Sequence, residues 1–216
     1  MNAPGLPPLL PGSEILDPVP LEVARPMVLL RLGYRRPSQV PDKTARMIAE
    51  VEERGRFLLA PRAILAEVAV AAGGGAVALG GDRLRSASRS LGERLEGCRT
   101  AVLFAATVGE ALEAWGRELL DAGQMARSLL VDAYASSAAI LLGTEIETIV
   151  TRRFAARGLA AGKRYAPGYG DWALEDQTPL CALVGAGRIG IRVTAEHLML
   201  PAKSISGVIG GRPAAG

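Results

Sequence analysis

The chain has 216 residues, of which 49% are hydrophobic and 22% are charged, and its formal net charge is +3. This length and composition fit one folded domain with a small appendage, and the near balance of 25 basic and 22 acidic residues gives no support to nucleic-acid binding. A single histidine, His197, excludes a metal site built from several histidines.

Targeting and redox features are also limited. No apolar run of about 18 residues free of charge is present, so no membrane span is predicted. The first residues, MNAPGLPPLLPGSE, lack the basic and apolar regions of a signal peptide, which predicts a cytoplasmic protein. The two cysteines, Cys98 and Cys181, match no metal-binding spacing and are predicted to be reduced, buried thiols.

The N-terminal half begins with residues 1–24, whose prolines predict an extended arm that is either packed on the body or mobile. The apolar run at residues 26–32 predicts a short strand. Asp42 is predicted to cap a helix that runs to about residue 54. The glycine triplet at residues 73–75 predicts a turn between two strands. A phosphate cradle is the alternative, but the triplet lacks the Lys and Ser/Thr of a P-loop.

Residues 86–96 predict a helix, with Arg85, Arg89 and Arg94 on a basic face. Such a face is either solvated or a docking surface for an acidic partner. The run at residues 100–109 predicts a buried strand that is covered on both faces and leads into a turn.

The remaining elements interleave helices and strands without a regular repeat. Helices are predicted at residues 110–120, 124–157 (with a bend at Gly143) and 173–184. A strand is predicted at residues 189–194, and a turn followed by a final strand at residues 200–209. This order favours an α+β fold over a doubly wound sheet. The predicted organisation is an arm at 1–24, a body at 25–211 and a frayed end at 212–216.

The stretch Arg-Tyr-Ala-Pro-Gly-Tyr-Gly-Asp-Trp, at residues 164–172, contains two of the four tyrosines and one of the two tryptophans. Arg164 can hold a carboxylate or phosphate through parallel N–H donors, and Gly168 and Gly170 permit close approach of a ligand. Tyr169 can supply a flat face with a polar tip. The stretch is therefore either a ligand clamp or a structural turn whose aromatic rings close the edge of the core.

Two motifs carry a family resemblance. Residues 164–169 are similar to the R-x-x-x-G-Y signature of the S-adenosylmethionine-binding activation (reactivation) domain of cobalamin-dependent methionine synthase, most of all its stand-alone form. About thirty residues later the chain has the counterparts of a second pattern in that family, namely Thr194, Met199, Pro201, Ser204, Ser206 and Gly207.

The resemblance implies a twisted, mainly antiparallel sheet with flanking helices, wrapped into a C-shaped domain over residues 25–211. It also implies a groove that binds S-adenosylmethionine. By position, Arg164 would bind the carboxylate of the ligand, and Ala166, Gly168 and Tyr169 would line the groove. No residue of this chain is expected to act as a catalytic acid or base, because the family's methyl transfer depends on positioning.

The implied role is that of a subunit in methionine biosynthesis that acts with a partner chain, the cobalamin-binding core of methionine synthase or another corrinoid protein. When the partner's cobalt falls to the inactive Co(II) state, one methyl group and one electron restore it by reductive methylation. A flavodoxin- or ferredoxin-like protein would supply the electron. The D-x-H-x-x-G motif of cobalamin carriers is absent around His197, so cobalamin would arrive only through the partner.

Two positions depart from the family pattern. Ala195 stands where the family has Glu, and Ile140 stands about where its long helix presents a carboxylate. Asp132 or Glu145 could replace that carboxylate only if the helix is rotated or bent. These departures leave open a non-catalytic docking module that has lost the ligand. A self-contained methyltransferase is a third hypothesis, although no convincing base lies near the clamp.

Overall fold

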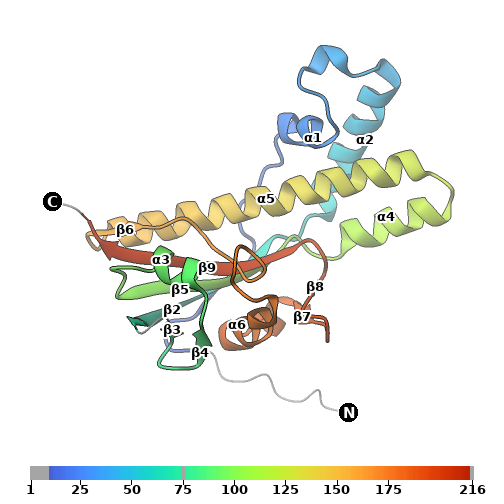
Figure 1. The fold of residues 1–216 in the computed structure, drawn as a ribbon. Helices are drawn as coiled ribbons and strands as arrows, with labels where there is room; N and C mark the ends of the chain where they lie inside the picture. Colours follow the sequence, from blue (N-terminus) through green and yellow to red (C-terminus); the bar gives the residue numbers. More distant parts are fainter. Residues whose placement is uncertain (1–9, 74–75, 215–216) are drawn as a thin grey trace.

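The computed structural model describes residues 10–73 and 76–214. Figure 1 shows one long helix lying across a twisted sheet. The helices are α1 Arg25–Arg31, α2 Asp42–Leu58, α3 Arg89–Arg94, α4 Ala111–Asp121, α5 Met125–Ala155 and α6 Gln177–Val184. The strands are β1 Glu14–Leu16, β2 Arg62–Gly73, β3 Ala76–Leu79, β4 Leu84–Ser86, β5 Thr100–Thr107, β6 Leu159–Ala161, β7 Arg192–Val193, β8 Met199–Leu200 and β9 Ser204–Pro213.

The main sheet is antiparallel and has the order β4-β3-β2-β5-β9-β6, while β7 and β8 form a separate hairpin. β2 pairs with β5 along its first part, and near its end it pairs with β3. β1 pairs with β2 at residues 63–65. β5 is central, with Phe104 opposite Leu65 on one side and Gly207 on the other. The α+β fold with a mainly antiparallel sheet and flanking helices, predicted from the sequence, is confirmed.

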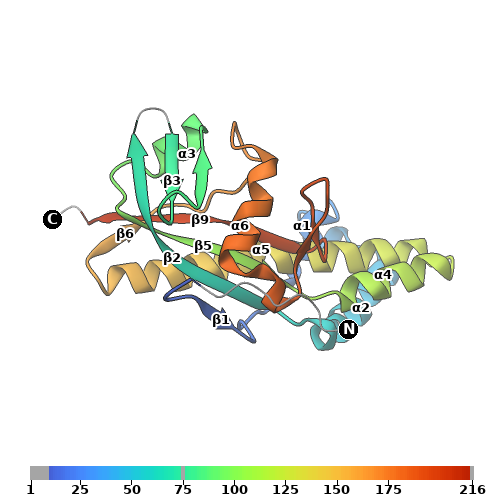
Figure 2. The same ribbon diagram turned by 90° about the horizontal axis from the view of Figure 1, so that it is seen from below.

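Both faces of the sheet are covered, as the apolar run in β5 predicts. Successive side chains of a strand point to opposite faces. In β5, the alternate residues Val102, Phe104 and Ala106 therefore pack in a core with α5. Ala101 and Leu103 pack in a second core with α6. Figure 2 shows α6 on the opposite side of the sheet from α5.

Helix α5 is the central helix of the first core and lies antiparallel to α4, with α1 and α2 near its N-terminal half (Figure 1). Among the described residues it is the one helix long and apolar enough, by length and composition, to cross a membrane, and 61% of its most apolar window is buried in the fold. Its small buried residues, such as Ala133, Ser137 and Ala138, allow the sheet and neighbouring helices to approach closely. Packing within the core thus accounts for its apolar character.

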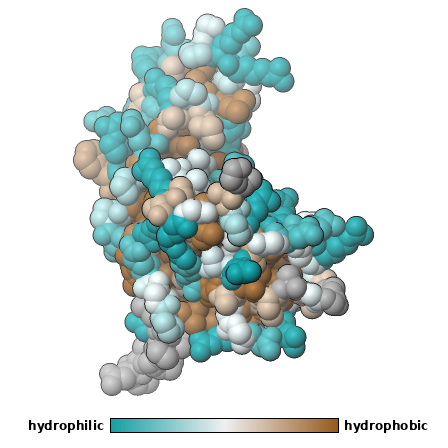
Figure 3. Space-filling model, turned by 90° about the vertical axis from the view of Figure 1, so that its left-hand side faces the viewer, coloured by the Kyte–Doolittle hydropathy of each residue, from teal (hydrophilic) through white to brown (hydrophobic). Residues whose placement is uncertain are grey.

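On the face that Figure 3 shows, hydrophilic side chains surround apolar areas.

The strand predicted at residues 26–32 is wrong, because this segment forms α1. Pro26 lies in the first turn of the helix, where its missing N–H costs no hydrogen bond. A short apolar run has no period that separates a strand from a buried helix turn. Packing against α5 decides the outcome, since Val28 and Leu29 are buried in its core.

Other boundaries also differ from prediction: the helix predicted at residues 86–96 covers only Arg89–Arg94, and the one predicted at residues 173–184 begins at Gln177. Asp42 is the first residue of α2 and not its cap, since Pro41 holds the cap position without a side-chain hydrogen bond, and the helix continues to Leu58. The predicted strand at residues 189–194 is reduced to Arg192–Val193. The frayed end predicted from residue 212 is wrong at Arg212 and Pro213, which continue β9 and pair with β6.

The predicted N-terminal arm is partly described. Residues 10–24 are extended and packed, with Leu10 and Val19 buried and β1 in the sheet, whereas residues 1–9 lie outside the described part. At the predicted glycine turn, Gly73 and Ala76 pair across the end of the β2–β3 hairpin, and residues 74–75 lie outside the described part. Apart from the position of the frayed end, the division of the chain into arm and body remains a prediction.

Candidate functional site

A cavity of about 560 Å³ lies beside α5, the segment after β6 and the start of β9. Three of the four predicted site residues, Arg164, Ala166 and Tyr169, line it. The remaining lining residues are Arg94, Ala139, Ile140, Glu147, Lys163, Tyr165, Pro167, Gln177, Met199, Ser204, Ile205 and Ser206. Both C-terminal sequence motifs therefore meet at one hollow, which falls within the usual range of about 300–1,000 Å³ for ligand sites.

Gly168, the fourth predicted site residue, is not among the lining residues of this cavity. Its φ of +86° is a left-handed conformation that glycine adopts without strain. Its backbone nitrogen donates to the carbonyl oxygen of Trp172 at 2.8 Å, which closes the turn. Gly168 thus shapes the turn that presents Tyr169, which is 67% exposed.

Arg164 is held from one side by helix α5. Glu147 Oε1 accepts from the backbone nitrogen of Arg164 at 2.9 Å, and Oε2 accepts from its Nη1 atom at 3.2 Å. The side chains of Arg164 and Glu147 are 33% and 22% exposed, so the ion pair is partly buried but still accessible to a ligand. A Cβ at Gly143 would lie 2.8 Å from Arg164 Nη1, so the glycine leaves space for the guanidinium.

Tyr165 anchors the segment in the sheet and supports the turn. Its backbone exchanges hydrogen bonds with Val208 of β9, at 3.0 and 2.8 Å. Its hydroxyl donates to the carbonyl oxygen of Tyr169 at 2.6 Å, and its ring stacks on Trp172 with centroids 5.7 Å apart. The guanidinium carbon of Arg94 lies 4.4 Å from the centre of the Tyr165 ring, a cation–π geometry.

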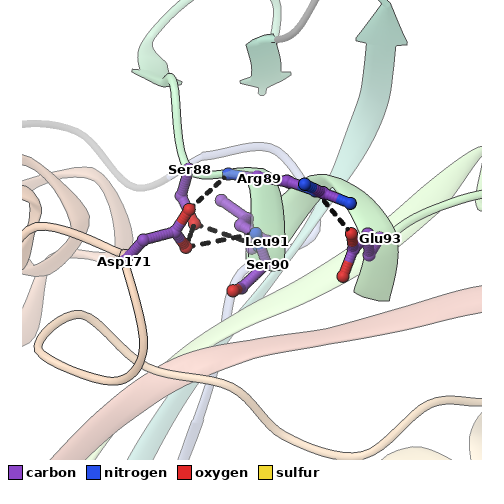
Figure 4. A network of polar contacts seen from close by, with 6 residues as sticks. All are labelled: Ser88, Arg89, Ser90, Leu91, Glu93 and Asp171. Atoms are coloured by element: carbon purple, nitrogen blue, oxygen red, sulfur yellow. Dashed lines mark hydrogen bonds and ion pairs between the residues drawn. The ribbon is translucent and has the colours of Figure 1, made fainter.

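Asp171 joins the turn to α3 (Figure 4). Its carboxylate accepts from Ser88 Oγ at 2.6 Å and from the backbone nitrogens of Arg89 at 2.8 Å and Ser90 at 3.1 Å. A carboxylate at a helix N-terminus satisfies N–H groups that have no partner within the helix. The hydrogen bond from Ser88, followed by those from Ser90 and Arg89, lowers the pKa of Asp171 to about 2.

The predicted basic face on α3 is divided among different partners. Arg89 pairs with Glu93 at 2.8 Å on the helix surface, and Arg85, in β4, lies 3.4 Å from Asp82. Only Arg94 of the three reaches the cavity. No sequence pattern predicts that Arg94 lines the cavity with Arg164, because the two residues are 70 positions apart and the neighbours of Arg94 form an ordinary helical surface.

The second motif contributes Met199, Ser204 and Ser206 to the cavity lining, but not Thr194, Pro201 or Gly207. Gln177 Nε2, from α6, donates to Ser206 Oγ at 2.6 Å, which fixes one polar side of the hollow. Ser204 Oγ is buried and has no hydrogen-bond partner among the described residues. Such an atom is uncommon in a folded protein, since most buried polar groups are paired.

At the position of the family's helix carboxylate, Ile140 lines the cavity and is 38% exposed. Asp132 does not replace that carboxylate, because it pairs with Lys203 at 2.7 Å away from this cavity, and Glu145 is absent from its lining. Glu147, two helical turns after Ile140 on the same face, is the one carboxylate that lines the cavity within the described part of the chain. The spacing of seven residues between Ile140 and Glu147 is the sequence pattern that could have identified Glu147 as a lining residue.

Ala195 and His197 lie in the turn of the β7–β8 hairpin and do not line the cavity. His197 is half-buried, has a φ of +62° and shares a hydrogen bond of 2.8 Å between its Nδ1 atom and Thr178 Oγ1. Beside it, a hydrogen bond from Thr194 lowers the pKa of Glu196. The histidine therefore helps to hold the hairpin on α6.

No family model matches the chain, and no curated protein sequence does. Among solved structures, the chain is similar to the MetH reactivation domain bound to AdoHcy, with a TM-score of 0.66 and 14% sequence identity. The similarity covers 95% of this chain and 80% of that one. At this identity the likeness concerns the fold, and the fold of this protein is that of the reactivation domain.

Proposed function

We propose that the cavity binds S-adenosylmethionine and that the chain is a cytoplasmic reactivation subunit, which presents the methyl donor to cobalamin held by a partner protein. The observation that carries this proposal is the meeting of Arg164 and Glu147 in one cavity of about 560 Å³. An amino-acid tail has a carboxylate and an ammonium group, and this pair offers the complementary charges. The solved neighbour, which was bound to AdoHcy, supports the same ligand class.

Other lining residues fit the rest of such a ligand. Tyr169 offers an exposed ring that a purine can stack on. Ile140 and Met199 supply apolar surface, and Ser204 Oγ is a buried polar atom that a ligand group could pair with. Gly168 would act through the turn that places Tyr169 and Ala166.

In this proposal S-adenosylmethionine, when bound, supplies an electrophilic methyl group on its sulfonium. The residues of this chain bind and orient the donor. Arg164 would grip the carboxylate with the N–H donors that Glu147 leaves free, because a guanidinium has five. Holding the donor in one orientation lowers the entropic cost of the reaction with a second molecule, without any proton transfer by the chain.

The partners in this proposal are a cobalamin-binding methionine synthase core, or another corrinoid protein, and a flavodoxin- or ferredoxin-like electron donor. Exposed apolar side chains would face the corrinoid protein. They are Ile140 and Tyr169, which line the cavity, and Leu174, Leu198 and Leu200, which are close in the chain to the lining residues Gln177 and Met199.

Calorimetry with S-adenosylmethionine on the wild type and on Arg164→Ala tests the proposal. We expect the variant to bind at least about tenfold more weakly, because a charge-assisted hydrogen bond contributes about 1.5–3 kcal/mol. Arg127→Ala is a matched control, since Arg127 pairs with Glu50 on the surface and does not line this cavity. Equal affinities for wild type and Arg164→Ala, or no binding by the wild type, would overturn the proposal.

A second candidate function is a docking module without the ligand. Ile140 and Ala195, which replace family carboxylates, favour it, and so does the engagement of Arg164 by Glu147. A pull-down with a purified cobalamin-binding protein separates the two functions. The docking module predicts capture that is indifferent to S-adenosylmethionine, whereas the reactivation subunit predicts capture that the ligand changes.

A further inference from the structure

The side chains that line the cavity carry more positive than negative charge. Three cationic side chains, Arg94, Lys163 and Arg164, line it together with a single carboxylate, that of Glu147. Glu147 is already paired with Arg164. Within the described part of the chain, neither Arg94 nor Lys163 forms an ion pair. Two positive charges therefore remain uncompensated at this hollow.

Arg94 is an exposed residue, but its guanidinium is held in place at the cavity by its contact with Tyr165. Its guanidinium lies over the Tyr165 ring, and Tyr165 is fixed by its hydrogen bonds to Val208. The helix that carries Arg94 is tied to the same loop by the three hydrogen bonds to Asp171. A cation anchored by an aromatic face keeps its full charge, whereas a cation paired with a carboxylate is largely neutralised.

A fixed positive potential distinguishes two ligands of nearly the same shape. In S-adenosylmethionine the sulfonium adds one permanent positive charge to a zwitterionic tail. S-adenosylhomocysteine has lost one methyl group and that charge, so it is neutral overall. Uncompensated cations within the cavity repel the first ligand and leave the second almost unaffected.

We propose that Arg94 and Lys163 make this cavity selective by charge, so that it holds the neutral thioether S-adenosylhomocysteine more tightly than the sulfonium S-adenosylmethionine. This selectivity rests on the proposed function, since it concerns the same site. The selectivity also affects turnover. S-adenosylhomocysteine, the product of methyl donation, competes with the next S-adenosylmethionine for the cavity until its own concentration falls.

The test is the ratio of the two dissociation constants, measured by calorimetry on the full chain. For the wild type we expect S-adenosylhomocysteine to bind about tenfold more tightly, which is the scale of a screened repulsion from two exposed cations. Arg94→Gln should lower that ratio about threefold, and Arg94→Lys, which keeps the charge, should retain it. Arg89→Gln is the matched control on the same helix, because Arg89 pairs with Glu93 outside the cavity.

Lys163 is exposed like Arg94 but has no such ring contact among the described residues, so Lys163→Gln is a second test in case removal of the Arg94 side chain disturbs the contact with Tyr165. Raising the salt concentration should also reduce the ratio, since salt screens the repulsion that the exposed cations exert on the sulfonium. A wild type that binds the sulfonium equally well or better would overturn the charge selectivity and leave the proposed function standing. An unchanged ratio in both glutamine variants would overturn the charge selectivity in the same way. Failure of both ligands to bind would overturn the two proposals together.

Discussion

Glu147 accepts hydrogen bonds from both the backbone nitrogen and the Nη1 atom of Arg164, at 2.9 and 3.2 Å. The pair spans seventeen residues and joins α5 to the segment after β6. Because both carboxylate oxygens hold the same residue, the guanidinium is oriented before any ligand arrives. Its position depends on the space above Gly143, which leads to the first prediction.

Replacing Gly143 by Ala should weaken ligand binding while the fold is retained. Alanine favours the helix by about 1 kcal/mol over glycine, so α5 itself gains stability. However, the new Cβ would lie 2.8 Å from Arg164 Nη1 and 3.0 Å from Ile205 Cδ1, both of which are ends of flexible side chains. We expect the guanidinium to shift and the affinity for S-adenosylmethionine, measured by calorimetry, to fall about tenfold.

Gly116→Ala is the control for this substitution. Gly116 lies in α4, where a Cβ would meet Val131 Cγ1 at 3.7 Å and Ser128 Oγ at 3.9 Å, which are ordinary contacts. It should raise the melting temperature without changing ligand affinity. An unchanged affinity in Gly143→Ala would contradict the assignment of Arg164.

The acid stability of the protein should depend on Asp171. Its pKa is lowered from 3.8 to about 2, mainly by the hydrogen bond from Ser88, so the folded state favours the ionised carboxylate. Its contribution to stability is complete above about pH 4 and is lost as the pH falls toward 2, since the unfolded chain binds the proton first. Asp171→Asn should therefore melt at a lower temperature than the wild type at neutral pH, and the difference should shrink between pH 4 and pH 2.

Asp121→Asn, at the exposed C-terminal end of α4, serves as the comparison for the loss of a carboxylate. Melting curves of the three proteins across the pH range check the prediction. If the gap between wild type and Asp171→Asn stays constant down to pH 2, the carboxylate does not stabilise α3 through its charge.

Gly207→Ala should destabilise the fold severely. Gly207 has a φ of +157°, and a Cβ there would overlap the carbonyl oxygen of Tyr165. The backbone hydrogen bonds between Tyr165 and Val208 would have to break or lengthen. We expect a loss of about 2–4 kcal/mol in the free energy of unfolding, measured by urea denaturation.

Gly92→Ala in α3 is the reference for this experiment, since its Cβ would meet only Val77 Cγ2 at 3.7 Å. It should be neutral or slightly stabilising. A Gly207→Ala protein as stable as the wild type would mean that the backbone of residues 164–172 approaches β9 less closely than the structure has it.

The two cysteines should differ in reactivity. Burial raises the pKa of Cys181 to about 11, against a smaller opposite effect of the hydrogen bond from Gln177. Burial also raises the pKa of Cys98, opposed by the nearby charge of Arg212, but Cys98 is only half-buried. Because the thiolate is the reactive form, we expect slow modification by a disulfide reagent at pH 8, with Cys98 reacting before Cys181.

Cys98→Ser should abolish the earlier phase of that reaction, and addition of denaturant should expose one remaining thiol. Persistence of the earlier phase in Cys98→Ser would show that α6 opens readily enough to expose Cys181. In that case the second core would be less stable than its packing indicates.

The parts of the fold that the sequence predicts are those with a long or regular pattern. β5 is a continuous apolar run covered on both faces, and α5 repeats its apolar residues over 31 residues. The strand predicted at residues 26–32 is wrong because an apolar run of this length has no period that separates strand from helix, and contact with α5 selects the helix. The frayed end predicted from residue 212 is wrong because the pairing of Arg212 with Ala160 is a tertiary contact, which no local sequence pattern indicates.

The site residues that the sequence predicts belong to one short motif, whereas other residues that line the cavity come from distant parts of the chain. Arg164, Ala166 and Tyr169 line the cavity and belong to one short motif. Arg94 and Gln177 reach it from other elements, and only the folded sheet brings them together. Glu147 lies seven residues after Ile140, so helical geometry alone could have placed both on the helix face that lines the cavity.

The position of β5 between β2 and β9 has a consequence for biosynthesis. β2 leaves the ribosome before β5, so one edge of β5 is paired at once, but its other edge waits for residues 204–211. At a translation rate of about 5–20 residues per second, that interval lasts about 5–20 seconds. During this interval, β5 is an almost wholly apolar strand with one unpaired edge, to which other nascent chains can pair. A chaperone would therefore be needed during this time.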